Sequence, residues 1–116
     1  MYQVFYDCYS LESLNLSHFD TSSVTDMRYM FYNCINLKSL DISNFDTSKV
    51  IYMHNFFDNS ISLTSLNLSH FDTSSVIDMS NMFRDCIKLV SLDISNFNTS
   101  KVTDIYQLFW NCTSLT

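Results

Sequence analysis

The sequence predicts an α/β repeat fold, a solenoid of about four and a half coils of 26 residues, with a parallel β-sheet on one face and short helical turns. Three apolar columns recur at this period. They are Phe5, Phe31, Phe57, Phe83 and Phe109; Leu11, Leu37, Leu63, Leu89 and Leu115; and Phe19, Phe45, Phe71 and Phe97. One coil cannot bury its apolar face alone, whereas stacked coils share a continuous core.

We expect one domain over residues 1–116. Its units are 1–10 (partial), 11–36, 37–62, 63–88, 89–114 and 115–116 (partial). Met1 falls in the column of Met27, so the sequence opens part-way through a unit and predicts an excerpt of a longer array. Neither end shows a polar cap. We therefore expect self-association through the uncapped ends.

Each unit begins with a predicted strand. In residues 11–17 leucine alternates with serine and asparagine, a period of two that is typical of a half-buried strand. Its equivalents are 37–43, 63–69 and 89–95, which stacking would make neighbours in a parallel sheet.

The strand is followed by an inward-facing Phe19 and by a turn at Asp20-Thr21-Ser22. Beyond Val24 the apolar residues are three and four apart, the helical spacing. We predict an extended piece at 24–27 and a short helical turn at 28–33.

Composition excludes some partners. A net charge of −6 without any cluster of Lys or Arg argues against nucleic acid and anionic membranes as partners. No apolar run is long enough to span a bilayer, so we expect no membrane insertion by this segment.

The chain has neither Gly nor Pro, the usual turn residues. Asn or Asp precedes every position of the cysteine column, and these residues tolerate left-handed backbone conformations. We predict left-handed turns at Asp7, Asn33, Asn59, Asp85 and Asn111.

Cys8, Cys34, Cys86 and Cys112 share a column with Ser60. This exchange favours small, buried, reduced thiols over disulfides. The absence of a C-x-x-C pair argues against zinc.

Two carboxylate columns raise the question of calcium. One is Asp20, Asp46, Asp72 and Asn98; the other is Asp26, Asp78 and Asp104. Asn98 keeps the acceptor oxygen and loses the charge, which favours turn formation over calcium binding. The three histidines form no ligand set, and no unit differs from the others as a catalytic site would. We predict no enzyme activity, no cofactor and no metal.

The motifs L-x-S-L-D-I-S-N-F-D-T-S-K-V and D-M-x-x-M-F-x-x-C-x-x-L resemble the BspA-like leucine-rich repeat of bacterial surface proteins. The resemblance covers the whole chain and implies a leucine-rich-repeat-like, right-handed solenoid. It also implies a secreted or cell-surface location and adhesion to host matrix proteins, such as fibronectin or fibrinogen, or to other cells. Asn or Asp in place of glycine, Ser60 and Tyr52 depart from the family pattern.

Two functions remain open. The first is protein binding, either through the variable column of Tyr6, Tyr32, Arg84 and Trp110 or through the polar strand positions Asp41, Asn67 and Asp93. The second is a structural spacer with no ligand of its own, which near-identical coils favour.

Overall fold

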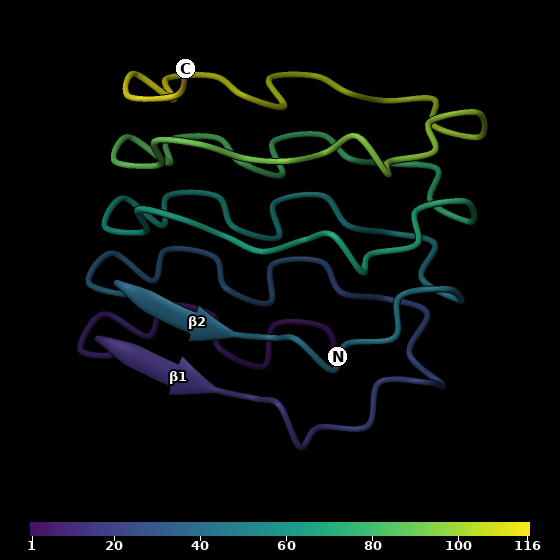
Figure 1. The fold of residues 1–116 in the computed structure, drawn as a ribbon, viewed down its shortest axis with the longest axis horizontal. Helices are drawn as coiled ribbons and strands as arrows, with labels where there is room; N and C mark the ends of the chain where they lie inside the picture. The colour runs from purple at the N-terminus through teal and green to yellow at the C-terminus, as the bar shows by residue number, and fades with distance from the viewer.

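The computed structural model describes residues 1–116 and contains no helix. Its strands are β1 (Ser13–Asn15) and β2 (Ser39–Asp41), which pair in parallel with Leu14 opposite Leu40. Further parallel contacts are isolated bridges at Asp26–Tyr52, Tyr52–Asp78, Asp78–Asp104 and Ser65–Ser91. The backbone passes around the interior in successive layers from the purple to the yellow end (Figure 1). We call one such passage of 26 residues a circuit.

The predicted fold class, an α/β leucine-rich-repeat-like solenoid with helical turns, is therefore wrong. There is no helix, the sheet consists of two three-residue strands, and the molecule is compact, with extents of 31 × 29 × 21 Å. The related descriptions of the chain as a leucine-rich repeat, a solenoid and a repeat protein are wrong for the same reason.

The helical spacing has another physical origin. Met30 N–H donates to the Met27 carbonyl and Tyr32 N–H to the Tyr29 carbonyl, so residues 27–34 form successive tight turns. Between them, Phe31 N–H donates to the Phe56 carbonyl of the next circuit. Left-handed residues recur at Tyr29 and Asn33, with φ of 56° and 60°, and a right-handed helix cannot contain them. Apolar residues three and four apart therefore mark paired turns.

The strands are shorter than their alternating pattern predicts. Ser17 N–H and Ser43 N–H donate to the side-chain oxygens of Asn15 and Asp41, two residues earlier. These local turns end the pairing that would extend β1 and β2. In the later circuits, the equivalent pairing is reduced to the single bridge between Ser65 and Ser91.

The core lies inside the circuits. The ring of Phe31 stacks on those of Phe5 and Phe57 with centroids 5.5 Å apart, and Phe83 and Phe109 continue this column. Phe45 and Phe71 are also buried. The inward position predicted for Phe19 is wrong, since 43% of this residue is exposed.

A column of buried threonines joins neighbouring circuits. The Thr47 hydroxyl accepts a hydrogen bond from Asp72 N–H at 2.8 Å and donates to the Asp72 carbonyl at 2.9 Å. Thr21 makes the same pair with Asp46, and Thr73 makes it with Asn98. We call this column the threonine corner.

The acidic residues beside the threonine corner form turns. Asp20, Asp46, Asp72 and Asn98 each accept a hydrogen bond from the backbone N–H two residues later, at 2.9–3.0 Å. Asn98 does this as well as the aspartates, so the turn interpretation is confirmed. The left-handed turns predicted at Asp7, Asn33, Asn59, Asp85 and Asn111 are also confirmed, with φ of 56–60°.

All four cysteines are free, as predicted, and Cys34 and Cys86 are fully buried. The Cys86 thiol donates to the Phe57 carbonyl at 3.3 Å, and the Ser60 hydroxyl donates to the Phe31 carbonyl at 2.9 Å. Serine therefore replaces cysteine in the same hydrogen bond. Burial raises the pKa of the Cys34 thiol to about 12.

The last circuit has backbone donors without a partner in the protein. The N–H groups of Gln107, Phe109 and Asn111 donate no hydrogen bond, whereas the equivalent Asn81, Phe83 and Asp85 donate to the following circuit. Self-association through the ends stays a prediction.

Candidate functional site

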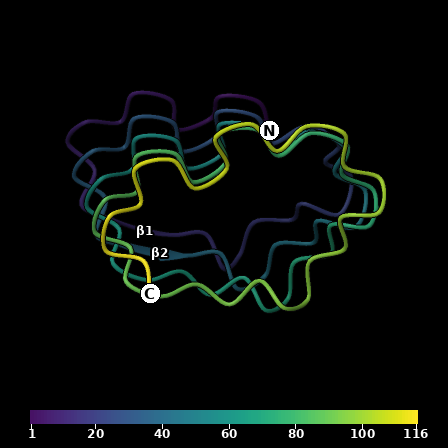
Figure 2. The same ribbon diagram turned by 90° about the horizontal axis from the view of Figure 1, so that it is seen from above.

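One side of the molecule is formed by five equivalent segments: residues 2–7, 26–33, 52–59, 78–85 and 104–111. We call it the aromatic face. β1 and β2 lie across the interior from the N-terminal segment (Figure 2), so the aromatic face and the strand side are separate surfaces. Each segment is bonded to the next through backbone groups, as Asn33 N–H to the Asp58 carbonyl and Asn59 N–H to the Arg84 carbonyl.

Four tyrosines of the aromatic face form a cluster: Tyr2, Tyr6, Tyr29 and Tyr32. The rings of Tyr6 and Tyr32 stack with centroids 4.8 Å apart and an interplanar angle of 10°. The Tyr29 ring contacts those of Tyr2, Tyr6 and Tyr32 edge-on, with centroids 5.6–6.3 Å apart. Among the tyrosine hydroxyls only that of Tyr9 has a hydrogen-bond partner within the protein, so the four hydroxyls of the cluster are left to solvent or to a ligand.

Tyr29 occupies a costly backbone position. Its φ of 56° lies in the left-handed region, where the equivalent residues are Gln3, Asn55, Asn81 and Gln107. Asn is well tolerated there, whereas an aromatic residue is strained by about 1 kcal/mol or more. The sequence prediction missed Tyr29, although a Tyr in a column of Asn and Gln was a readable signal.

The predicted binding column does not form one exposed line. Tyr6 and Trp110 are 40% and 49% exposed, whereas Asp58 at the centre is only 2% exposed. The Asn55 side-chain amide donates to the Asp58 carboxylate at 2.6 Å, and the Arg84 guanidinium lies 3.8 Å from the same oxygen. Burial raises the pKa of Asp58, although Asn55 and Arg84 act in the opposite direction.

The predicted column thus falls into two aromatic ends separated by a buried polar centre. Tyr6 and Tyr32 stack at one end. At the other, the Arg84 guanidinium lies 5.4 Å from the centroid of the Trp110 ring. The structure brings Tyr6 to Tyr32 and Arg84 to Trp110, but it does not bring the two pairs together.

Arg28 lies between two aromatic rings, a feature that the sequence prediction missed. Its guanidinium is 5.0 Å from the Tyr2 centroid and 5.2 Å from the Tyr52 centroid. Its Nε and Nη2 donate to both carboxylate oxygens of Asp26, at 2.6–3.0 Å. This bidentate geometry is characteristic of strong arginine–carboxylate pairs.

His54 Nδ1 lies 2.7 Å from the Asp78 carboxylate in the next circuit. Burial alone would raise the pKa of Asp78, but the hydrogen bonds from Ser80 and the charge of His54 lower it. All three basic side chains of the aromatic face, Arg28, His54 and Arg84, therefore lie against carboxylates.

The polar strand positions, which were predicted as the alternative protein-binding surface, form turns. Asp41, Asn67 and Asp93 each accept a hydrogen bond from the backbone N–H two residues later, at 2.9–3.1 Å. These hydrogen bonds lower the pKa of Asp41 and Asp93. The strand side thus repeats one local turn in each circuit.

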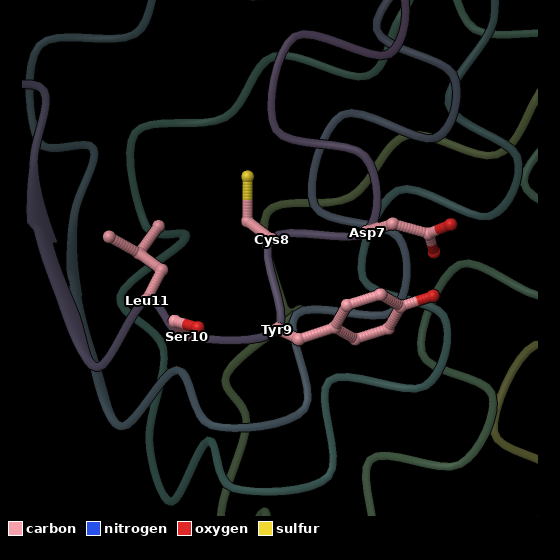
Figure 3. A pocket seen from close by; sticks show the side chains of 5 residues that line it. All are labelled: Asp7, Cys8, Tyr9, Ser10 and Leu11. Carbon is pink, nitrogen blue, oxygen red and sulfur yellow. The ribbon is translucent and has the colours of Figure 1, made fainter.

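A shallow hollow of about 460 Å³ is lined by Asp7, Cys8, Tyr9, Ser10 and Leu11. Figure 3 shows the Cys8 thiol pointing away from the Asp7 carboxylate and the Tyr9 hydroxyl. The Asn33 amide donates to the Asp7 carboxylate at 2.8 Å and to the Tyr9 hydroxyl at 3.2 Å. The hollow therefore places no acid–base partner beside the thiol.

No group of three or more His, Cys, Asp or Glu residues is arranged to hold a metal ion. The structure has no helix long and apolar enough to cross a membrane.

The fold and the face define a small protein of stacked circuits with a tyrosine-rich surface. The family model described as "Mycoplasma protein of unknown function, DUF285" matches residues 1–116, and the chain belongs to this family. Neither the curated proteins nor the solved structures contain a match. The resemblance to BspA-like proteins stays a prediction.

Proposed function

We propose that the protein is a non-enzymatic, cell-surface module that binds another protein through the tyrosine cluster. The observation that carries this proposal is the stacked, partly exposed set of Tyr2, Tyr6, Tyr29 and Tyr32 with unpartnered hydroxyls. Tyrosine offers a large amphipathic contact area at a low cost in side-chain entropy. Rings already held by one another lose still less freedom on binding.

The strained backbone of Tyr29 supports the same proposal. Asn55 and Asn81 occupy the equivalent left-handed position without the penalty of an aromatic side chain, so folding alone does not require tyrosine. The Tyr29 ring is, however, the member that contacts the other three rings. A role for the assembled cluster accounts for a residue that the backbone disfavours.

Location and ligand class rest on the resemblance to BspA-like proteins. It favours a secreted or cell-surface location and a ligand among host matrix proteins or on other cells. Fibronectin and fibrinogen are therefore the first ligands to test.

The alternative is a structural spacer without a ligand. The threonine corner and the strand-side turns favour it, because the same hydrogen bonds recur in successive circuits. The spacer account gives no reason for Tyr29, a residue that its backbone position disfavours.

The test measures binding of the 116-residue protein to immobilised fibronectin and fibrinogen. Tyr32→Ala and Tyr6→Ala should each weaken binding by about 1–2 kcal/mol, the cost of truncating an interface anchor. Tyr106→Ala is the matched control, because this tyrosine is 65% exposed and lies outside the cluster. Asp93→Ala and Asn67→Ala test the strand side.

Loss of binding in the two cluster variants alone supports the proposal. Loss in Asp93→Ala or Asn67→Ala alone moves the contact to the strand side. If the wild-type protein binds neither ligand, the spacer account is favoured.

A further inference from the structure

The charge of the aromatic face indicates what kind of partner it fits. Its five segments carry six carboxylates and two guanidinium groups. The carboxylates are Asp7, Asp26, Asp58, Asp78, Asp85 and Asp104; the guanidinium groups are those of Arg28 and Arg84. No lysine lies in these segments, and both arginines are already paired with carboxylates of the face. The face is therefore complementary to a cationic partner.

The protein's own arginines show which cation fits. The guanidinium of Arg28 is held by two aromatic rings and by the carboxylate of Asp26. Arg84 repeats the combination with the Trp110 ring and with Asp58 and Asp85. A planar guanidinium suits this arrangement because it stacks on a ring while its edge donates to a carboxylate.

Within the tyrosine cluster, Arg28 covers the Tyr2 ring, but no cation lies over the rings of Tyr6 and Tyr32. Tyr6 and Tyr32 stack on one another. Asp7 follows Tyr6 in the chain, and the Asn33 amide donates to its carboxylate at 2.8 Å. No basic side chain forms an ion pair with Asp7. Burial raises the pKa of Tyr32; the negative charges of Asp58 and Asp7 add to this shift, and the positive charge of Arg84 opposes it.

We propose, on the basis of the binding role proposed above, that the cluster of Tyr6, Tyr29 and Tyr32 with Asp7 receives an arginine side chain of a basic segment in the partner protein. The guanidinium stacks on the exposed ring of Tyr6, which Tyr32 supports from its other side, and donates to the Asp7 carboxylate. The unpartnered tyrosine hydroxyls are then free to bond the backbone of the same segment.

The test uses fluorescein-labelled hexa-arginine and hexa-lysine peptides, which carry equal charge, and measures fluorescence polarisation at 50 and 300 mM NaCl. The wild-type protein should bind hexa-arginine at least about fivefold more tightly than hexa-lysine at both salt concentrations, because stacking is less screened than charge attraction. Tyr32→Ala, Tyr6→Ala and Asp7→Asn should each reduce this preference to about twofold or less.

Tyr106→Ala is the matched control and should keep the full preference. Circular dichroism of each variant shows whether it is folded, and Tyr6→Ala tests the site even if Tyr32→Ala unfolds. Equal affinity for the two peptides in the wild-type protein, or an equal loss in Tyr106→Ala, would overturn the proposal in favour of general attraction to an acidic protein.

Competition separates this proposal from the proposed function. If fibronectin or fibrinogen binds through Tyr32 and hexa-arginine does not displace it, the protein-binding role stands and the arginine site fails. If hexa-arginine binds through Tyr32 and neither matrix protein binds, the arginine site stands and those two ligands are wrong.

Discussion

The threonine corner and the aromatic face are built on the same circuits but use their residues differently. In the corner, Thr21, Thr47 and Thr73 make identical hydrogen-bond pairs. On the aromatic face, the backbone hydrogen bonds also repeat from circuit to circuit: Phe31 N–H donates to the Phe56 carbonyl, and Phe57 N–H donates to the Met82 carbonyl. The exposed side chains of the face nevertheless change in every segment. The corner and the backbone thus hold the circuits together, which leaves the side chains of the face free to differ.

The corner should give the largest effect on stability. Thr47→Val keeps the shape of a fully buried side chain but leaves the N–H and the carbonyl of Asp72 without their partner. Unsatisfied buried groups cost about 1–3 kcal/mol each, so we expect a loss of about 2–4 kcal/mol in the free energy of unfolding, measured in urea.

Thr99→Val is the matched control. Thr99 is the equivalent residue in the last circuit, where its hydroxyl makes no such pair, and it is exposed. We expect a change below about 0.5 kcal/mol. Equal losses in Thr47→Val and Thr99→Val would show that the corner does not join the circuits.

The buried polar centre of the aromatic face should give the next largest effect. Arg84→Ala removes the cation beside Asp58, which is 2% exposed and keeps only its hydrogen bond from Asn55. Because Arg84 is partly exposed and 3.8 Å away, we expect a loss of about 1–2 kcal/mol, less than for a fully buried pair. Asp58→Asn, added to Arg84→Ala, should recover part of the lost free energy of unfolding because it removes the buried charge. If it recovers none, the unpaired charge of Asp58 is not the cause of the loss.

The same carboxylate predicts a pH dependence. Burial raises the pKa of Asp58 in the folded protein, so the folded state binds this proton more tightly than the unfolded state. The contribution of the group to stability is therefore full below its unfolded pKa and is lost as the pH rises through the folded pKa. Asp58→Asn should gain stability relative to the wild type as the pH rises above about 4, the ordinary pKa of an aspartate. A difference independent of pH would refute the shift.

The sequence predicted those features that depend on one residue type in one local setting. Asn and Asp were expected in left-handed turns, and Asn98 in place of aspartate indicated a turn rather than a calcium site; the structure confirms both. Ser60 in the cysteine column correctly indicated a buried filler at Cys34 and Cys86, whereas the burial predicted for Cys8 and Cys112 is wrong, because these two are only half-buried. In each case the exchange itself shows which property of the side chain matters.

The helix prediction was wrong because two different backbone conformations give the same spacing of apolar residues along the sequence. Paired four-residue turns place apolar residues three and four apart, just as a helix does, and only the left-handed column with Tyr29 distinguishes them. The binding site stays a prediction, but its column is not uniform, because Asp58 is buried whereas Tyr6 and Trp110 are exposed. Stacking partners such as Arg28 and Tyr2 become visible only in three dimensions.

The cysteine column should show a smaller effect. Cys86→Ser should change the free energy of unfolding by less than about 1 kcal/mol, because Ser60 makes the same bond to a carbonyl 29 residues earlier. In the native wild-type protein, a thiol reagent should modify Cys8 and Cys112 before the buried Cys34 and Cys86. Four equally fast thiols would contradict the burial.

The smallest effect on stability should come from Tyr29→Asn, which separates the requirements of the fold from those of the site. Asparagine already occupies this left-handed position at Asn55 and Asn81, so the backbone strain of about 1 kcal/mol is relieved. The lost ring contacts with Tyr2, Tyr6 and Tyr32 act in the opposite direction, and each is worth about 0.5–1.5 kcal/mol. Because the four rings are partly exposed, we take the low end of this range, a total of about 1.5 kcal/mol for the three contacts, and the relieved strain offsets most of it. Urea unfolding should therefore change by less than about 1 kcal/mol, while binding to the protein ligand and to hexa-arginine weakens at least about fivefold. Asn81→Tyr, which introduces the backbone strain without the ring contacts of the cluster, should lose stability and gain no binding.

Tyr29→Asn could instead unfold the protein and leave the binding of its folded fraction intact. In that case the tyrosine cluster stabilises the fold, as the threonine corner does, and has no binding role.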